Sequence, residues 1–171
     1  MEIEKKFRVV CLPENLEEFE KKEIEQGYLC TSPVVRVRRS NDRYILTYKS
    51  DGRHLGFSAG ENTKDVRMNE EVEVPLSREG YLHLREKIDD HLISKTRYLI
   101  PLSGGHTGEL DVFHGRLDGL YFIEVEFSDE EDAANFVPPE WFGENVSMDE
   151  RYTNSFLSKC DNLDVFDRCY L

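Results

Sequence analysis

The chain opens with MEIEKKF (residues 1–7), a stretch in which ionisable and apolar side chains alternate. Residues two apart in a β-strand point to the same side of a sheet. Glu2, Glu4 and Lys6 therefore share one face of the predicted strand, and Ile3 and Phe7 lie off that face. A strand that merely faces solvent carries a mixed set of polar residues. Here the face of Glu2, Glu4 and Lys6 is wholly ionisable, and this pattern is the starting point for predicting the fold.

The same spacing of two recurs on the later strands. Seven strands carry the theme, and the further positions are Arg36 and Arg38, Lys49 at a strand end, Glu71 and Glu73, Lys95 and Arg97, Glu109 and Asp111, and Glu124 and Glu126. A single such pair is usually a solvated face with cross-strand ion pairs. The repetition on seven strands indicates a common purpose for these faces.

Period-2 alternation is the main secondary-structure signal, which predicts an α+β, β-dominated fold. The predicted strands, about eight and enough to close a β-barrel, cover residues 1–10, 28–31, 34–39, 43–49, 66–74, 92–101, 107–114 and 120–127. Helices are predicted over residues 13–26, 77–87, 129–136 and 151–159, from their capping residues and apolar spacing. Residues 50–64 contain three glycines and are expected to be a long connection.

Length and charge exclude several classes of protein. The 171 residues carry a formal net charge of −13, which leaves no general attraction to nucleic acid or to an anionic membrane. One domain over residues 1–160 is expected, followed by a tail (161–171) without an interpretable pattern. No apolar stretch approaches the length of a membrane span, and a cytoplasmic location with free cysteines is predicted.

Ligand binding explains the charged faces better than a contribution to stability does. If the apolar faces turn outward under the helices, the charges line the inside of the barrel. Eight acids and six bases there leave a net charge of −2, and their burial costs several kcal/mol per ion unless they are paired. Two Mg²⁺ or Mn²⁺ ions would reverse this charge and favour a phosphate polyanion. The alternative is that all charged faces point outward, because periodicity does not say which face is inside.

These residues resemble the CYTH superfamily of triphosphate tunnel metalloenzymes. The hallmark Glu-x-Glu-x-Lys stands here at residues 2–6, and the other charged pairs follow in the family's order up to about residue 157. Residues 26–29 (QGYL) and 140–143 (EWFG) look like the small bacterial members that hydrolyse inorganic tripolyphosphate. The resemblance implies an eight-stranded antiparallel β-barrel, or tunnel, with flanking helices.

The resemblance also implies roles for individual residues. Lys6 and Tyr28 would form a catalytic dyad that orients or deprotonates the attacking water. The residues expected to hold the triphosphate are Lys6, Arg36, Arg38, Lys49, Lys95, Arg97 and, from the last helix, Arg151. The carboxylates expected to hold Mg²⁺ or Mn²⁺, with two ions during turnover, are Glu2, Glu4, Glu71, Glu73, Glu109, Asp111, Glu124 and Glu126.

The leading hypothesis is therefore a metal-dependent triphosphatase that prefers tripolyphosphate over nucleoside triphosphates and acts as a monomer or homodimer. Three alternatives stay open. A class IV adenylate cyclase shares the fold but needs a base-recognition site, which the sequence does not reveal. A thiamine triphosphatase needs an aromatic site, for which Trp141 is a candidate. A non-enzymatic polyphosphate-binding module would need fewer carboxylates.

Overall fold

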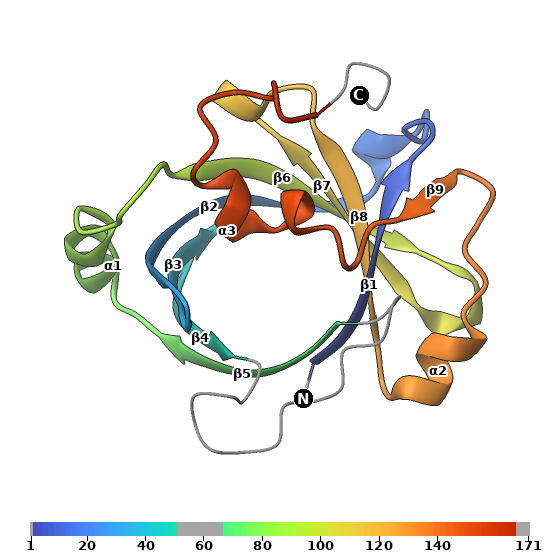
Figure 1. Ribbon diagram of the computed structural model, residues 1–171, viewed down its shortest axis with the longest axis horizontal. Coiled ribbons are helices and arrows are strands. Elements are labelled where there is room, and N and C mark those ends of the chain that lie inside the picture. The colour runs from blue at the N-terminus through green and yellow to red at the C-terminus, as the bar shows by residue number, and fades with distance from the viewer. Residues whose placement is uncertain (1, 51–66, 167–171) are drawn as a thin grey trace.

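The protein is described by a computed structural model, which covers residues 2–50 and 67–166; of residues 67–69 it gives the backbone only. It forms a β-dominated antiparallel sheet (Figure 1) whose nine strands are β1 (Glu2–Val9), β2 (Glu20–Thr31), β3 (Val34–Ser40), β4 (Arg43–Ser50), β5 (Arg67–Pro75), β6 (Ile93–Pro101), β7 (Thr107–Phe113), β8 (Tyr121–Phe127) and β9 (Phe142–Asn145). The described α-helices are α1 (Arg78–Arg85), α2 (Glu130–Asn135) and α3 (Asn154–Leu157).

The sheet curls around a central space in Figure 1, with α1 and α2 on its outside. Its strand order is β5-β4-β3-β2-β6-β7-β8-β1-β9. Strand β1 has three neighbours, because its first residues also pair with β5, with Glu2 opposite Asn69 and Glu4 opposite Arg67. Strand β5, which begins this order, therefore lies beside β1, the eighth strand of the order.

The predicted helix over residues 13–26 is wrong. Only a short 3-10 turn, η1 (Leu16–Glu18), forms there, and β2 already begins at Glu20, eight residues before the strand predicted at Tyr28. Gly27 directly follows the predicted helix, where a glycine is typical of a helix end, but it lies inside β2. A Cβ at this position would stand 2.7 Å from Cγ2 of Ile88, so the glycine makes room for the chain that follows α1.

Two further elements differ from the sequence-based expectation. Strand β9 was not predicted, and it pairs with the second half of β1. The predicted helix over residues 151–159 is divided into a 3-10 turn, η5 (Glu150–Tyr152), and the short α3. Elements of three or four residues span too few periods to give a helix or strand signal. The other predicted strands and the helices at residues 77–87 and 129–136 are present, with shifts of a few residues at their ends. The predicted connection at residues 50–64 lies outside the described residues, except for Ser50.

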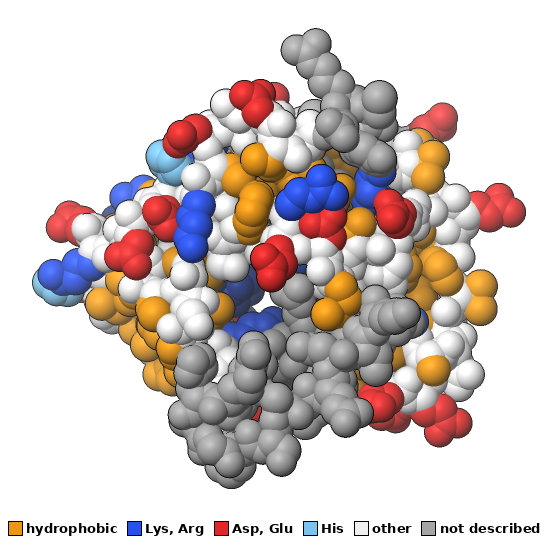
Figure 2. Space-filling model, in the orientation of Figure 1, with side chains coloured by type: hydrophobic (Ala, Val, Ile, Leu, Met, Phe, Trp, Pro, Cys, Tyr) orange, Lys and Arg blue, Asp and Glu red, His pale blue; other side chains and the backbone are white. Residues whose placement is uncertain are grey.

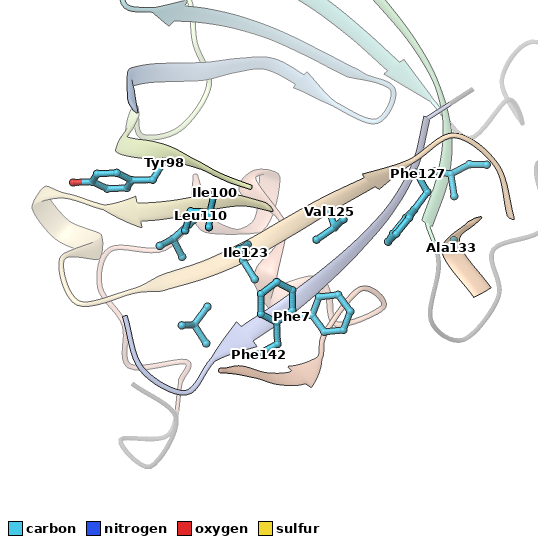
Figure 3. Packing of buried hydrophobic residues seen from close by; sticks show 11 residues of the cluster. Phe7, Tyr98, Ile100, Leu110, Ile123, Val125, Phe127, Ala133 and Phe142 are labelled. Carbon is cyan, nitrogen blue, oxygen red and sulfur yellow. The ribbon is translucent and has the colours of Figure 1, made fainter. Parts of the chain in front are cut away.

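The apolar side chains form two clusters on either side of the sheet wall. The first packs on the outer faces of β1, β6, β7 and β8 and includes Phe7, Leu110, Ile123 and Phe142 (Figure 3). The second lies under the C-terminal segment, and it includes the ring of Phe166. Burial of these apolar surfaces is the main stabilising contribution to the fold.

Local features agree with the sequence. Ser77 caps α1 by accepting a hydrogen bond from the Gly80 amide at 3.0 Å, and Asp129 caps α2 through the Asp132 amide at 2.8 Å. The described cysteines, at positions 11, 30 and 160, are free thiols. Over the described part of the chain, no helix is long and apolar enough to cross a membrane.

Candidate functional site

The charged strand faces converge on one cavity of about 610 Å³. Figure 2 shows a hollow near the centre of the visible face with Lys and Arg atoms inside it. The charged faces therefore point inward over the described strands, and the alternative of an outward orientation is wrong for them. The predicted site residues that line this cavity are Glu2, Glu4, Lys6, Tyr28, Arg36, Arg38, Lys49, Glu71, Arg97, Glu109, Glu124 and Glu126.

Four predicted site residues do not line the cavity. Glu73 on β5 is exposed to solvent. Arg151 lies in η5, where its guanidinium pairs with Asp149 at 2.6 Å. Lys95 and Asp111 are instead fully buried in the wall, each with a side-chain exposure of 0%. In this structure these four positions therefore lie outside the lining of the cavity, and their roles stay predictions.

Lys95 and Asp111 belong to a buried ion network around Arg97. Asp111 accepts hydrogen bonds from Nε and Nη2 of Arg97 at 2.7 and 2.8 Å, and another from Lys95 at 2.5 Å. Burial lowers the pKa of Lys95 to about 8, although Asp111 acts in the opposite direction. Burial tends to raise the pKa of Asp111, but Arg97 and Lys95 prevail and hold it below its usual value. The oxygens of Asp111 are thus engaged with cations of the protein itself.

Lys6 joins the strand wall to the C-terminal segment. Its ammonium lies 2.9 Å from Glu124 and donates to the carbonyl oxygen of Tyr152 at 2.8 Å. Glu124 is also bound by Arg97 at 2.8 Å, and these cations depress its pKa well below the usual range despite the opposing effect of burial. Tyr28 lines the same cavity as Lys6, but over the described residues no hydrogen bond links the two side chains. The predicted dyad is therefore not formed in this structure.

A second group of carboxylates is short of counter-ions. Glu2 pairs with Lys49, which also lies 3.5 Å from Glu71. Over the described residues Glu4 makes no hydrogen bond or ion pair; burial raises its pKa, as do the charges of Glu124 and Glu2, against the effect of Lys49. Burial likewise raises the pKa of Glu126, together with the four carboxylates of residues 2, 109, 4 and 71. This excess of negative charge fits a cation bound among these oxygens.

The carboxylates nevertheless do not form a closed metal cage. Within residues 2–50 and 67–166, no three acidic, histidine or cysteine side chains stand close enough together to hold a metal ion by themselves. Mg²⁺ is commonly bound by one or two carboxylates together with waters and substrate phosphates. The donor set therefore fits an ion of this kind that is shared with a ligand.

Two arginines on β3 bring positive charge to the same cavity. Arg36 donates from Nη2 to the hydroxyl of Thr47 at 3.3 Å, and Arg38 donates from Nε to the side-chain oxygen of Gln26 at 3.1 Å. Neither guanidinium forms an ion pair with a described carboxylate, and Nε of Arg36 is buried without a partner there. Burial lowers the pKa of Arg38 to about 10, and the charges of Arg36 and Arg97 add to this effect. Such cations can bind an anion.

Sequence reasoning missed several residues of the site. Gln26 and Thr47 occupy inward-facing positions, two residues before Tyr28 and Lys49 respectively, so the period of two could have found them. Asn154 of α3 lines the cavity and accepts from Lys95 at 3.3 Å. Lys6 also binds the backbone carbonyl of Tyr152, and a backbone contact of this kind cannot be recognised from the residue type.

Known proteins are similar to this chain in sequence and in fold. An inorganic triphosphatase of Nitrosomonas europaea is 37% identical over 160 residues, which cover 92% of this chain and 96% of that protein. The chain belongs to the inorganic triphosphatase family. This agrees with the resemblance drawn from the charged motifs, although no protein-family model matches the sequence.

Other members of the inorganic triphosphatase family and more distant structures extend the comparison. An inorganic triphosphatase of Acetivibrio thermocellus is 35% identical over 136 residues, covering 78% of each chain. The crystal structure of an inorganic triphosphatase has a TM-score of 0.65 and 34% identity, and the match covers 94% of this chain and 95% of that one. A Hippeastrum adenylyl cyclase candidate with a dominant triphosphatase activity shares the fold, with a TM-score of 0.52 at 18% identity over 78% of this chain and 83% of that one.

Proposed function

We propose that this protein hydrolyses a triphosphate in a metal-dependent reaction, with inorganic tripolyphosphate as the preferred substrate and orthophosphate as product. The observation that carries the proposal is the division of charge inside one cavity. Arg36 and Arg38 lack acidic partners among the described residues, whereas Glu4 lacks a cationic one. A phosphate chain with a divalent cation satisfies both needs at once. The family's activity supports the same substrate class.

Each part of the cavity has a role in this proposal. Arg36, Arg38 and Lys49 bind phosphate oxygens and hold the chain in one register. Glu2, Glu4 and Glu126 hold Mg²⁺ or Mn²⁺, with the remaining cavity carboxylates available for a second ion. The bound ion neutralises developing charge and lowers the pKa of a water molecule. Lys6, fixed by Glu124 and the Tyr152 carbonyl, and Tyr28 orient the water at the terminal phosphorus.

The pairing of β1 with β5 supports the proposed tunnel. This contact brings together the first and the eighth strand of the order β5-β4-β3-β2-β6-β7-β8-β1. An eight-stranded tunnel would keep bulk water from the phosphate chain and strengthen the interactions of the buried charges. A single domain over residues 1–160 in the cytoplasm is part of the same proposal.

Product analysis tests the proposed reaction. Purified protein without an N-terminal tag is incubated with tripolyphosphate, ATP or thiamine triphosphate in the presence of Mg²⁺, Mn²⁺ or EDTA. Orthophosphate released from tripolyphosphate only with the metals is the expected result. Pyrophosphate with cyclic AMP from ATP would instead identify a cyclase, and binding of tripolyphosphate without turnover would identify a receptor.

The Glu4→Gln variant tests the metal role directly. It should lower the rate of tripolyphosphate hydrolysis by about a hundredfold or more, because a metal contact contributes several kcal/mol to the transition state. The matched control is Glu86→Gln, which changes an exposed carboxylate outside the cavity and should leave the rate unchanged. A Glu4→Gln enzyme with the wild-type rate would refute the assignment of Glu4 to the metal.

A further inference from the structure

Among the described residues, three arginines line the cavity, and they differ in the charge of their partners. The partners of Arg97 in this part of the chain are all carboxylates, from Glu109, Asp111 and Glu124. Arg36 and Arg38 donate instead to uncharged oxygens, a hydroxyl at 3.3 Å and an amide at 3.1 Å. These carboxylates neutralise the charge of Arg97, so its ion pairs hold neighbouring strands of the sheet together. The positive charge of the other two arginines is left for a ligand.

The uncharged partners are built into the sheet. Gln26 on β2 stands directly opposite Arg38 on β3, and Thr47 on β4 stands directly opposite Arg36. Both are fully buried, with 0% exposure. Since the register of three neighbouring strands fixes these pairs, each arginine has one acceptor held in place before any ligand binds.

Gln26 also carries a donor group that the described residues leave without a hydrogen bond. Its Nε2 atom is buried, and it has no hydrogen-bond partner over the described residues. A buried amide without partners costs free energy, so its retention beside Arg38 calls for an explanation. An amide orients Arg38 without cancelling its charge, whereas a carboxylate of the same size would bind Arg38 as an ion pair and compete with a phosphate.

We propose that Gln26 and Thr47 are positioning residues for triphosphate binding, acting as neutral acceptors that aim Arg38 and Arg36 into the cavity while leaving their charge available. This inference rests on the proposed function, because it takes a phosphate chain as the ligand of the two arginines. According to this inference, the affinity for a polyanion depends on the side chain at position 26 being uncharged.

The Gln26→Glu variant tests the inference, since it keeps the size of the side chain and adds one negative charge. We expect KM for tripolyphosphate, and its Kd measured by calorimetry in EDTA, to rise about tenfold or more, because a charge-assisted bond to phosphate is replaced by an internal one. The melting temperature should not fall. Gln26→Met, which removes the acceptor without adding charge, should raise KM less. Asn162→Asp is the matched amide-to-carboxylate control on the exposed surface, outside the cavity, and should change neither constant.

The outcomes separate this inference from the proposed function. A wild-type KM and Kd in Gln26→Glu would overturn it, and so would an equal loss in Gln26→Met, which would indicate packing alone. If Gln26→Glu does not fold, Thr47→Val takes its place, with an expected rise in KM of about threefold to tenfold from the loss of one acceptor of Arg36. If the wild type does not hydrolyse tripolyphosphate, the proposed function fails, and the Kd values still decide the role of Gln26.

Discussion

Asp111 shows how burial changes the meaning of a charged residue. Its carboxylate accepts from both Arg97 and Lys95 inside the wall, so we expect it to stabilise the fold rather than bind a metal. Asp111→Asn should lower the free energy of unfolding by about 3–5 kcal/mol, because buried Lys95 loses its carboxylate partner and Arg97 keeps only Glu109 and Glu124 among the described residues. Urea denaturation of the metal-free protein measures this loss.

The control for Asp111 is Asp118→Asn, which alters an exposed turn residue and should change stability by less than about 0.5 kcal/mol. A variant Asp111→Asn that keeps its stability but loses its response to Mg²⁺ would restore Asp111 to the metal ligands. The two variants together therefore distinguish a structural from a metal-binding carboxylate.

The spacing of two predicted which residues share a face of a strand, but it did not predict how deeply each side chain is buried. Glu109 and Asp111 share one face of β7, as their spacing requires, yet only Glu109 reaches the cavity. The depth of Asp111 depends on Arg97 and Lys95 of the neighbouring strand, which come close through the pairing of β6 with β7. Periodicity carries no information on such cross-strand distances.

At the scale of elements, Glu25 fixes helix α1 to the outer face of β2. Its carboxylate accepts from Tyr81 at 2.8 Å and from Nε of Arg85 at 2.7 Å. Arg85 lowers the pKa of Glu25, against the effect of burial and with the help of Tyr81. The folded pKa is thus below the unfolded one, so this stabilisation is present at neutral pH and is lost as pH falls through the folded pKa.

Glu25→Gln should therefore lower the free energy of unfolding at pH 7 by about 1 kcal/mol, a value kept small because the Arg85 pair is partly exposed to solvent. The difference between wild type and variant, measured by thermal or urea unfolding, should shrink as the pH is lowered into the range where Glu25 is protonated. A difference that is constant with pH would mean that packing, not charge, holds α1 in place.

The elements themselves were predictable where local signals were consistent. Ser77 and Asp129 cap the helices that the sequence predicted at these places, since capping depends on bonds within a few residues. The predicted helix over residues 13–26 is wrong although it had a proline near its start and Gly27 directly after its end. Gly27 lies in β2, and a glycine is needed there because a Cβ would clash with Ile88, which is far along the chain. Such a tertiary contact gives no local signal in the sequence.

At the scale of the whole molecule, the acidic charge of the cavity links stability to metal and pH. Burial and the neighbouring carboxylates raise the pKa values of Glu4 and Glu126, so in the metal-free protein their ionised forms are less favoured than those of ordinary carboxylates. A cation that binds these carboxylates in the folded state alone stabilises that state by mass action. Protons compete for the same oxygens, and they do so at a higher pH than for ordinary carboxylates.

We therefore expect Mg²⁺ or Mn²⁺ to raise the melting temperature by about 5 °C or more when the ion is about a hundredfold above its Kd. The increase should diminish as the pH falls through the raised pKa values, and EDTA should abolish it. Sodium chloride at equal ionic strength controls for general screening of the net charge of −13. Differential scanning calorimetry of the wild type and of Glu4→Gln measures this effect. An equal rise in melting temperature in both proteins, or a rise that does not depend on pH, would place the ion elsewhere on this acidic chain.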